Sequence, residues 1–242
     1  MKQRRFAVFD IDGTLIRWQL YHAVADALAK KGYLDSVAYD KVRAARRKWK
    51  TRAGNESFKD YETELIKVYD QLIKGLPLNN FNAAARAVIN EYKDQVYTYT
   101  RDLIKSLKQN NYLLFAISSS QAELVSKIAD YYGFDDWQAS TYLLKNGRFT
   151  GEKQTIYNLK DKLLDKLVKK HGLSFEGSMA VGDSESDIAM MEKVERAIAF
   201  NPTAGLFKHA KKRGWQVVVE RKNVIYDLEK RGNGYILAKT NG

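Results

Sequence analysis

The chain has 242 residues, of which 45% are hydrophobic and 12% aromatic, values typical of a folded globular protein rather than a disordered one. It contains no cysteine, which excludes disulfides, thiolate catalysis and zinc sites built from cysteine. Its formal net charge of +12 favours anionic ligands such as phosphorylated small molecules or nucleic acid. No apolar run approaches the roughly 20 residues of a membrane helix, so we expect a soluble, cytoplasmic protein without a membrane partner.

The first predicted element is a short apolar strand over residues 5–10, which ends in carboxylates. From residue 18 to about residue 97, apolar positions instead recur at helical spacing, and no convincing strand interrupts them. Within this block, residues 41–52 (KVRAARRKWKTR) are strongly basic and contain no acidic residue. This segment fits either a solvated helix face that packs through its apolar stripe or an anion-binding surface.

Strands and helices alternate after this block. Helices are predicted over 100–110, 123–132 and 156–171, strands over 112–118, 178–183, 197–200 and 215–219, and a hairpin over 141–151 that turns at Asn146-Gly147. Such alternation predicts an α/β fold with a doubly wound, mostly parallel sheet. Because the helical block interrupts the sheet after its first strand, we expect an α/β core of residues 1–16 and 98–242 and a helical insertion over 17–97.

Two aspartates follow the first strand in the stretch VFDIDGTLI. Asp10 and Asp12 are two residues apart, so their side chains leave the strand end on one side, and ligands of a doubly wound sheet bind outside the carboxyl ends of its strands. Such a pair can share Mg²⁺, which prefers oxygen ligands and completes its shell with substrate phosphate. One carboxylate can attack phosphorus to give an aspartyl-phosphate while the other moves protons. Gly13 allows the tight turn that follows, and a solvent-exposed turn rich in Asp and Gly is the structural alternative.

A second apolar strand also ends in acid, in the stretch AVGDSESDIAMM. In one parallel sheet, Asp183 would join Asp10 and Asp12 at the same edge, and so much negative charge is unfavourable unless a cation neutralises it. Asp187 follows four residues later and has a purely structural alternative, a capping box with Ser184 at the start of the next helix.

The two acidic stretches resemble motifs one and four of the haloacid dehalogenase superfamily, as DIDGT after an apolar strand and as GDSESD for G-D-x-x-x-D. The helical insertion after motif one resembles the cap of subfamily I B, the phosphoserine-phosphatase-like branch. The resemblance implies a Mg²⁺-dependent phosphomonoester hydrolase with a helical C1 cap domain. It implies Asp10 as the nucleophile and Asp12 as general acid and then base. Mg²⁺ would be held by Asp10, the backbone carbonyl of Asp12, and Asp183.

The other two motifs of this family have candidates in the expected places. Ser118 ends the predicted strand that matches motif two, and Lys160 lies where similar members carry the motif-three lysine. The resemblance implies that both bind the transferring phosphoryl oxygens and that Asp187 orients Lys160 or metal-bound water. Ser118 has the alternative of capping the following helix, and Lys153 and Lys162 are neighbouring alternatives to Lys160.

The substrate is the least defined part of the prediction. Trp18, Gln19 and His22 follow motif one closely and are candidates to face the substrate, although their spacing also suits helix packing. Ser186 stands where phosphoserine-specific members tend to carry Asn, so we predict only a small phosphorylated metabolite. Two alternatives stay open: a phosphotransferase on the same core, and an anion- or nucleic-acid-binding module that uses residues 41–52. The sequence predicts no oligomeric state.

Overall fold

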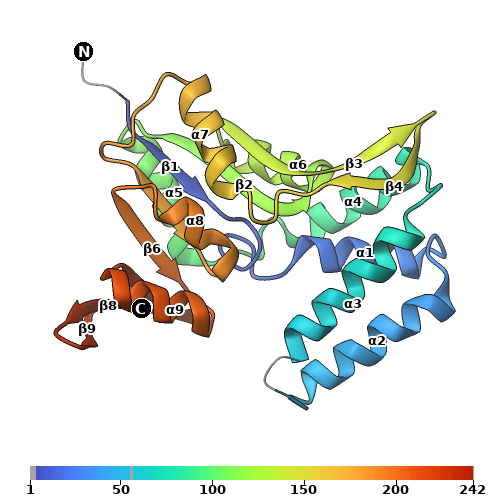
Figure 1. Ribbon diagram of the computed structural model, residues 1–242, viewed down its shortest axis with the longest axis horizontal. Coiled ribbons are helices and arrows are strands. Elements are labelled where there is room, and N and C mark those ends of the chain that lie inside the picture. Colours follow the sequence, from blue (N-terminus) through green and yellow to red (C-terminus); the bar gives the residue numbers. More distant parts are fainter. Residues whose placement is uncertain (1–3, 55–56, 242) are drawn as a thin grey trace. The chain divides into compact units, whose positions relative to one another are not determined.

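The computed structural model describes residues 4–54 and 57–241 and divides into two compact units. The core unit comprises residues 1–19, 92–140 and 155–242, and the helical unit comprises residues 20–91 and 141–154. Figure 1 shows the four helices that make up most of the helical unit: α1 (Leu20–Lys30), α2 (Ser36–Lys50), α3 (Ser57–Leu72) and α4 (Leu78–Tyr92). None of the described helices is long and apolar enough to cross a bilayer.

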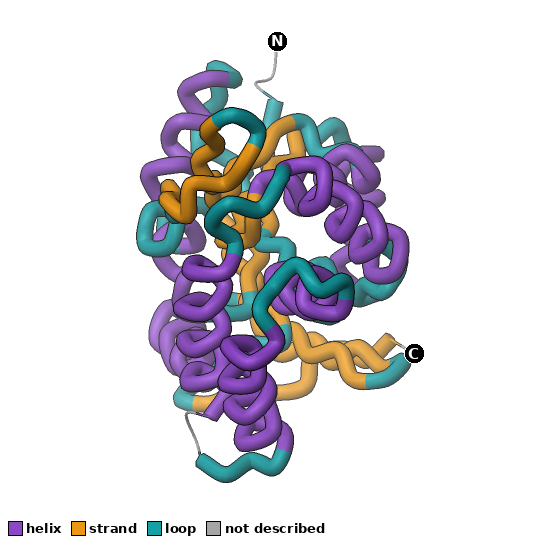
Figure 2. Tube along the Cα trace, turned by 90° about the vertical axis from the view of Figure 1, so that its right-hand side faces the viewer, coloured by secondary structure: helices purple, strands orange, loops and turns teal. Residues whose placement is uncertain are grey.

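A mixed sheet, most of whose strands belong to the core unit, has the strand order β4-β3-β2-β1-β5-β6-β7-β8-β9. Its strands are β1 (Phe6–Phe9), β2 (Leu113–Gln121), β3 (Asp136–Lys145), β4 (Arg148–Gln154), β5 (Met179–Gly182), β6 (Arg196–Phe200), β7 (Gln216–Arg221), β8 (Val224–Arg231) and β9 (Gly234–Asn241). Neighbours from β3 to β7 are parallel, whereas β4, β8 and β9 pair antiparallel. The prediction of an α/β fold with a mostly parallel sheet is therefore confirmed. The final pair β8–β9, which reaches the C-terminus in Figure 2, was not predicted.

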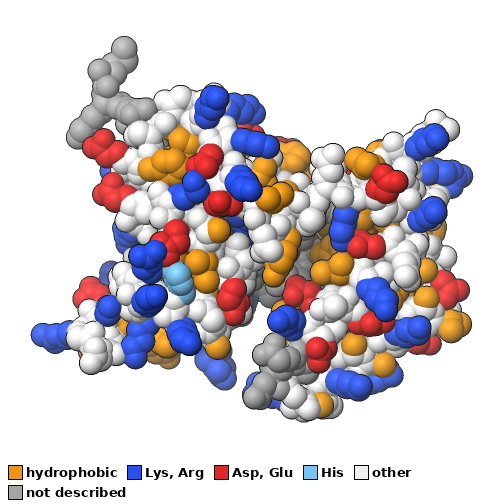
Figure 3. All heavy atoms as spheres, in the orientation of Figure 1, with side chains coloured by type: hydrophobic (Ala, Val, Ile, Leu, Met, Phe, Trp, Pro, Cys, Tyr) orange, Lys and Arg blue, Asp and Glu red, His pale blue; other side chains and the backbone are white. Residues whose placement is uncertain are grey.

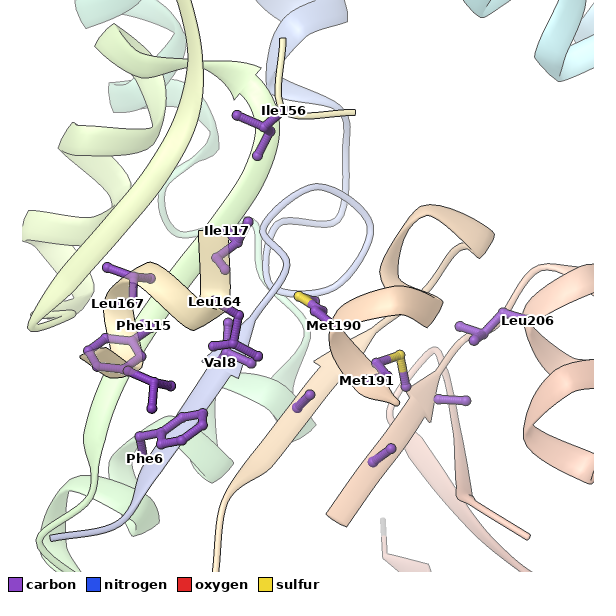
Figure 4. Packing of buried hydrophobic residues seen from close by; sticks show 14 of the residues in the cluster. Phe6, Val8, Phe115, Ile117, Ile156, Leu164, Leu167, Met190, Met191 and Leu206 are labelled. Atoms are coloured by element: carbon purple, nitrogen blue, oxygen red, sulfur yellow. The ribbon is translucent and has the colours of Figure 1, made fainter. Parts of the chain in front are cut away.

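Helices cover both faces of the parallel strands (Figure 1). They are α5 (Thr98–Gln109), α6 (Ala122–Tyr132), α7 (Lys160–Lys170), α8 (Ile188–Met191), which follows a 3₁₀ turn over Glu185–Asp187, and α9 (Ala204–Arg213). Side chains alternate along β1: Phe6 and Val8 enter the cluster formed with α7, α8 and α9 (Figure 4), whereas the Phe9 ring packs against Phe134 at 6.0 Å. Since β1 lies between β2 and β5 and is buried, its carboxyl end is held rigidly.

The hairpin of β3 and β4 turns at Asn146-Gly147, both with positive φ, as the sequence predicted. Its residues 141–154 belong to the helical unit, however, and the sequence had assigned them to the core of residues 98–242. The reason is tertiary hydrogen bonding: Gly75 N–H donates to the carbonyl of Phe149 at 2.8 Å. Strand β3 thus pairs with β2 at its start and with β4 beyond residue 140.

Candidate active site

Asp10 and Asp12 lie in the loop after β1, at the carboxyl edge of the sheet. The backbone N–H of Asp10 donates to the carbonyl of Val181 in β5 at 3.0 Å, which ties this loop to the neighbouring strand. Both aspartates are buried, with exposed fractions of 5% and 8%. They are therefore not residues of a solvent-exposed turn. Residues near the carboxyl ends of β2 and β5 approach them because the three strands are adjacent and parallel.

Lys160, the first residue of α7, is 2% exposed and reaches this edge. Its Nζ donates to Asp10 Oδ1 at 2.8 Å and to Asp187 Oδ1 at 2.5 Å. Burial opposes its charge, but the two carboxylates raise the pKa of Lys160 above its ordinary value, so it is an ammonium. The other two lysines considered from the sequence lie elsewhere, since Lys162 is exposed and Lys153 forms an ion pair within the helical unit.

Asp187 combines the two roles that the sequence left open. Its Oδ2 accepts hydrogen bonds from the backbone N–H groups of Asp183 and Ser184 at 3.1 and 3.0 Å, in a capping box at the 3₁₀ turn. Its Oδ1 holds Lys160 from the other side. Gly182 makes room for this carboxylate, because a Cβ there would lie 2.5 to 2.7 Å from Asp187 side-chain atoms.

Ser118 lies near the end of β2 and is buried beside Asp12. Its hydroxyl donates to Asp12 Oδ2 at 2.9 Å and accepts from the N–H of Ser120 at 3.1 Å. The residue at the N-cap of α6 is Gln121, so the Ser118 hydroxyl belongs to the acidic site and does not cap that helix.

Asp183 follows β5 and is positioned by two residues of the DIDGT stretch. The Thr14 hydroxyl donates to Asp183 Oδ1 at 3.3 Å. Gly13 has a φ of +78°, and a Cβ on it would lie 2.3 Å from Asp183 Oδ2. Sequence reasoning assigned Gly13 only to the turn and gave Thr14 and Gly182 no role. Their position inside the two acidic motifs is the sequence feature that could have identified them.

The edge carries more negative than positive charge. Asp10, Asp183 and Asp187 each offer an oxygen, and these oxygens lie within 4.8 Å of one another. Burial raises the pKa of Asp10 to about 7 although Lys160 opposes the shift, and burial with the Asp10 and Asp187 charges raises the pKa of Asp183 well above its ordinary value. A divalent cation would offset this repulsion, and hard oxygen donors fit Mg²⁺. Because hydrogen bonds already occupy both oxygens of Asp187, Asp10 and Asp183 are the carboxylates best suited to hold the ion.

The three candidate substrate-facing residues fall in different places. Trp18 and Gln19 are half-buried at the end of the first segment of the core unit, and their role stays a prediction. His22 lies in α1 of the helical unit, is 1% exposed, and packs edge-on against the Tyr61 ring at 4.9 Å. Burial and then Arg46 lower the pKa of His22 to about 3, so its ring is neutral. His22 is therefore a packing residue of the helical unit, because its position on the α1 helix turns it into that unit's aromatic core.

Comparison with known sequences agrees with this geometry. The family model of haloacid dehalogenase-like hydrolases matches residues 7–192. The phosphoserine phosphatase of Methanocaldococcus jannaschii is 26% identical over 202 residues, which cover 82% of this chain and 86% of the relative. The phosphoserine phosphatase of Archaeoglobus fulgidus is 28% identical over 210 residues, 83% of this chain, but the chain spans only 53% of that relative's length. The histidinol-phosphatase of Neisseria meningitidis is 26% identical over 233 residues, 89% of this chain and 98% of the relative.

Solved structures show the same fold. A phosphoserine phosphatase with an analogue of its phospho-aspartyl intermediate has a TM-score of 0.63 and 24% identity, covering 91% of this chain and 95% of its own. A Bordetella pertussis protein of unknown function has a TM-score of 0.73 and 22% identity, covering 89% and 98%. At these identities the likeness shows the fold alone. The matched family model extends over most of the chain, includes all four acidic residues and Lys160, and agrees with the fold. The chain therefore belongs to the haloacid dehalogenase-like hydrolases, and it is an enzyme whose curated relatives include phosphoserine phosphatases.

Proposed function

We propose that the chain is a Mg²⁺-dependent phosphatase that hydrolyses a small phosphomonoester through an aspartyl-phosphate on Asp10. The observation that supports this most is the buried ammonium of Lys160, 2.8 Å from Asp10 Oδ1, at an edge crowded with carboxylates. Asp10 Oδ1 accepts from Lys160 and has a second lone pair for the metal ion, so we assign the attack on phosphorus to Oδ2. The same ammonium offsets the repulsion between this carboxylate and a phosphate dianion.

The proposed chemistry has two displacements. In the first, Asp10 Oδ2 forms a bond to phosphorus, the ester bond breaks, and the leaving oxygen takes a proton from Asp12. In the second, Asp12 accepts a proton from water, which attacks phosphorus and releases Asp10. Ser118 donates to Asp12 at 2.9 Å, and we assign the same hydroxyl the role of a donor to the phosphoryl group when substrate is bound.

Asp10, Asp183 and the backbone carbonyl of Asp12 would hold the metal ion in this proposal. When bound, Mg²⁺ supplies charge neutralisation at the attacked phosphate. The protein itself positions the charged side chains of the site. The Thr14 hydroxyl and the glycine at position 13 fix Asp183, and Asp187 fixes Lys160.

The proposed substrate class follows from the names of the relatives. Phosphoserine phosphatase and histidinol-phosphatase are names for enzymes that act on small phosphorylated metabolites. We therefore propose the same class here, without selecting one metabolite.

Hydrolysis of p-nitrophenyl phosphate tests this function. We expect turnover with Mg²⁺, loss of turnover in EDTA, and a loss of at least about 10³-fold in Asp10→Asn. The matched control is Asp165→Asn, which removes an exposed carboxylate of the same unit that pairs with Lys193 at 2.8 Å, and which keeps the activity. Mass spectrometry of acid-quenched protein should find one phosphoryl group on Asp10. Full turnover by Asp10→Asn, or labelling of a different residue, would refute the proposal.

A further inference from the structure

The C-terminal part of the chain carries a charge that the hydrolase chemistry does not explain. Residues 193–242 contain eleven Lys and Arg and four Asp and Glu, a net +7 of the chain's +12. The matched family model ends at residue 192, before this segment. In Figure 3, Lys and Arg side chains gather over the region that α9 and the β8–β9 hairpin occupy in Figure 1.

Four lysines of this segment line one cleft of about 390 Å³ in the core unit. Lys208, Lys211 and Lys212 come from α9, Lys230 comes from β8, and the turn between β8 and β9 completes the wall. We call this the lysine cleft. All four side chains are exposed, and among the described residues none of them forms an ion pair. None of the described residues that line it is acidic.

Aromatic contacts fix the two walls of the lysine cleft against each other. The Phe207 ring of α9 packs on the Tyr235 ring of β9 with centroids 5.6 Å apart. The Tyr235 hydroxyl donates to the carbonyl of Trp215 at 2.8 Å, just after α9 ends. The hairpin is thereby attached to α9, so the four ammonium groups share one cleft in the folded protein.

We propose that the lysine cleft binds a compact ligand with several phosphate groups, such as an inorganic oligophosphate or a nucleoside polyphosphate. Neighbouring ammonium groups repel one another, and a ligand with three or four negative charges replaces that repulsion with attraction. Lysine binds phosphate as a point charge and needs no fixed bidentate geometry. The volume of about 390 Å³ lies within the range of about 300–1,000 Å³ typical of small-molecule sites.

The surroundings favour a compact ligand over a nucleic acid. A neighbouring hollow of about 250 Å³ shares Lys208 and Lys212, but its His209 contacts Glu192. Glu192 also pairs with Arg213 at 2.7 Å. Lysines without an ion pair therefore do not continue past this neighbouring hollow. A groove that binds single-stranded nucleic acid, by contrast, follows the backbone over several nucleotides. This inference does not depend on the proposed hydrolysis.

Calorimetric titration with inorganic tripolyphosphate tests the inference, in EDTA so that the acidic active site repels the probe. We expect one bound tripolyphosphate per chain and an affinity at least tenfold lower in Lys211→Gln/Lys230→Gln. The matched control is Lys166→Gln/Lys169→Gln on α7, which removes the same charge from exposed positions of the same unit and keeps the affinity. Both double variants should keep the thermal unfolding temperature and the hydrolysis of p-nitrophenyl phosphate, because none of these lysines touches the active site.

Three results would overturn the assignment. They are the absence of tripolyphosphate binding to the unmodified protein, an equal loss of affinity in both double variants, and tighter binding of a single-stranded oligonucleotide or of phosphatidylserine vesicles through the same lysines. The second result would indicate attraction to net charge alone, and the third would indicate a polymer or a membrane surface. Loss of hydrolysis in every variant, with tripolyphosphate binding retained, would affect only the proposed function.

Discussion

The helical unit contains partly buried ion pairs and the core unit contains a fully buried one, and the two units balance these charges differently. In the helical unit, Asp26 pairs with Arg46 at 2.6 Å and accepts a hydrogen bond from the Tyr39 hydroxyl at 2.7 Å. Asp70 pairs with Lys153 at 2.5 Å in the same way. Asp26 and Asp70 each have their own cation, so these two pairs are complete without a ligand.

The active-site edge of the core unit lacks this balance. Lys160 serves both Asp10 and Asp187, and Asp12 and Asp183 add two further carboxylates at the same edge. Buried charge without a partner destabilises a fold, so a surplus of this kind is expected where a cation and a substrate complete the site. The functional cluster therefore differs from the structural ion pairs in two ways: it is more deeply buried, and its carboxylates outnumber its cations.

Replacing the cation of each cluster should give the largest difference between the two units. Lys160→Met should lower p-nitrophenyl phosphate hydrolysis at least about 10³-fold and the free energy of unfolding by about 3 kcal/mol, because two buried carboxylates lose their partner. Lys153→Met, whose ion pair is partly exposed, should cost less than about 1 kcal/mol. Urea unfolding followed by circular dichroism measures both.

A double variant checks the cause of that loss. Asp10→Asn added to Lys160→Met removes one of the unpaired charges and should recover part of the lost stability, so the two effects are not additive. Simple addition of the two losses would show that Lys160 stabilises the fold through its methylene packing and not through charge.

The close approach of Gly13 to Asp183 gives the next largest effect. In Gly13→Ala the new Cβ would lie 2.3 Å from Asp183 Oδ2, so the carboxylate must move. We expect hydrolysis to fall about 100-fold and the Mg²⁺ concentration for half-maximal activity to rise. Gly172→Ala is the matched control, since it also has a positive φ, at +61°, but a Cβ there meets nothing within 4 Å. It should lose stability through backbone strain and keep the kinetics, and equal kinetic losses in both variants would contradict this explanation.

Local patterns sufficed to predict the parts of the site that depend on strand ends. Asp10 and Asp183 each follow an apolar strand, and parallel pairing of β1 with both β2 and β5 brings them to one edge together with Ser118. The alternation of strands and helices predicted a mostly parallel sheet, but the order of its strands is known only from the structure. The same reasoning found the hairpin turn at Asn146-Gly147, because that dipeptide suits two positive φ angles.

Features that depend on tertiary contacts were beyond these patterns. Helical periodicity extended the predicted helix back to residue 156, whereas α7 begins at Lys160. Only the contact with Asp10 distinguishes Lys160 from the neighbouring lysines. The Thr14 hydrogen bond to Asp183 joins residues 169 positions apart. Helical spacing near motif one likewise gave no indication whether His22 faces a substrate or a core of aromatic rings.

The neutral ring of His22 gives the smallest effect, one on stability against pH. Its pKa in the folded protein is about 3, below the ordinary 6.5, because burial disfavours the charged form. As pH falls below about 6.5, the unfolded chain binds a proton that the folded chain does not bind. The stabilisation is therefore complete above that pH and is lost progressively toward pH 3.

Non-titrating substitutions at this position should flatten the stability curve. Between pH 7 and pH 5 the unmodified protein should lose about 2 kcal/mol more free energy of unfolding than His22→Phe, as measured by urea titration at each pH. His22→Phe keeps a ring against Tyr61, whereas His22→Gln does not, so the two variants differ in their packing cost. If titration is the cause, both variants lose the same pH-dependent component despite that difference. Curves for both variants that run parallel to the unmodified protein's would show that His22 becomes protonated without unfolding the helical unit, and that its burial among aromatic rings does not exclude the charge.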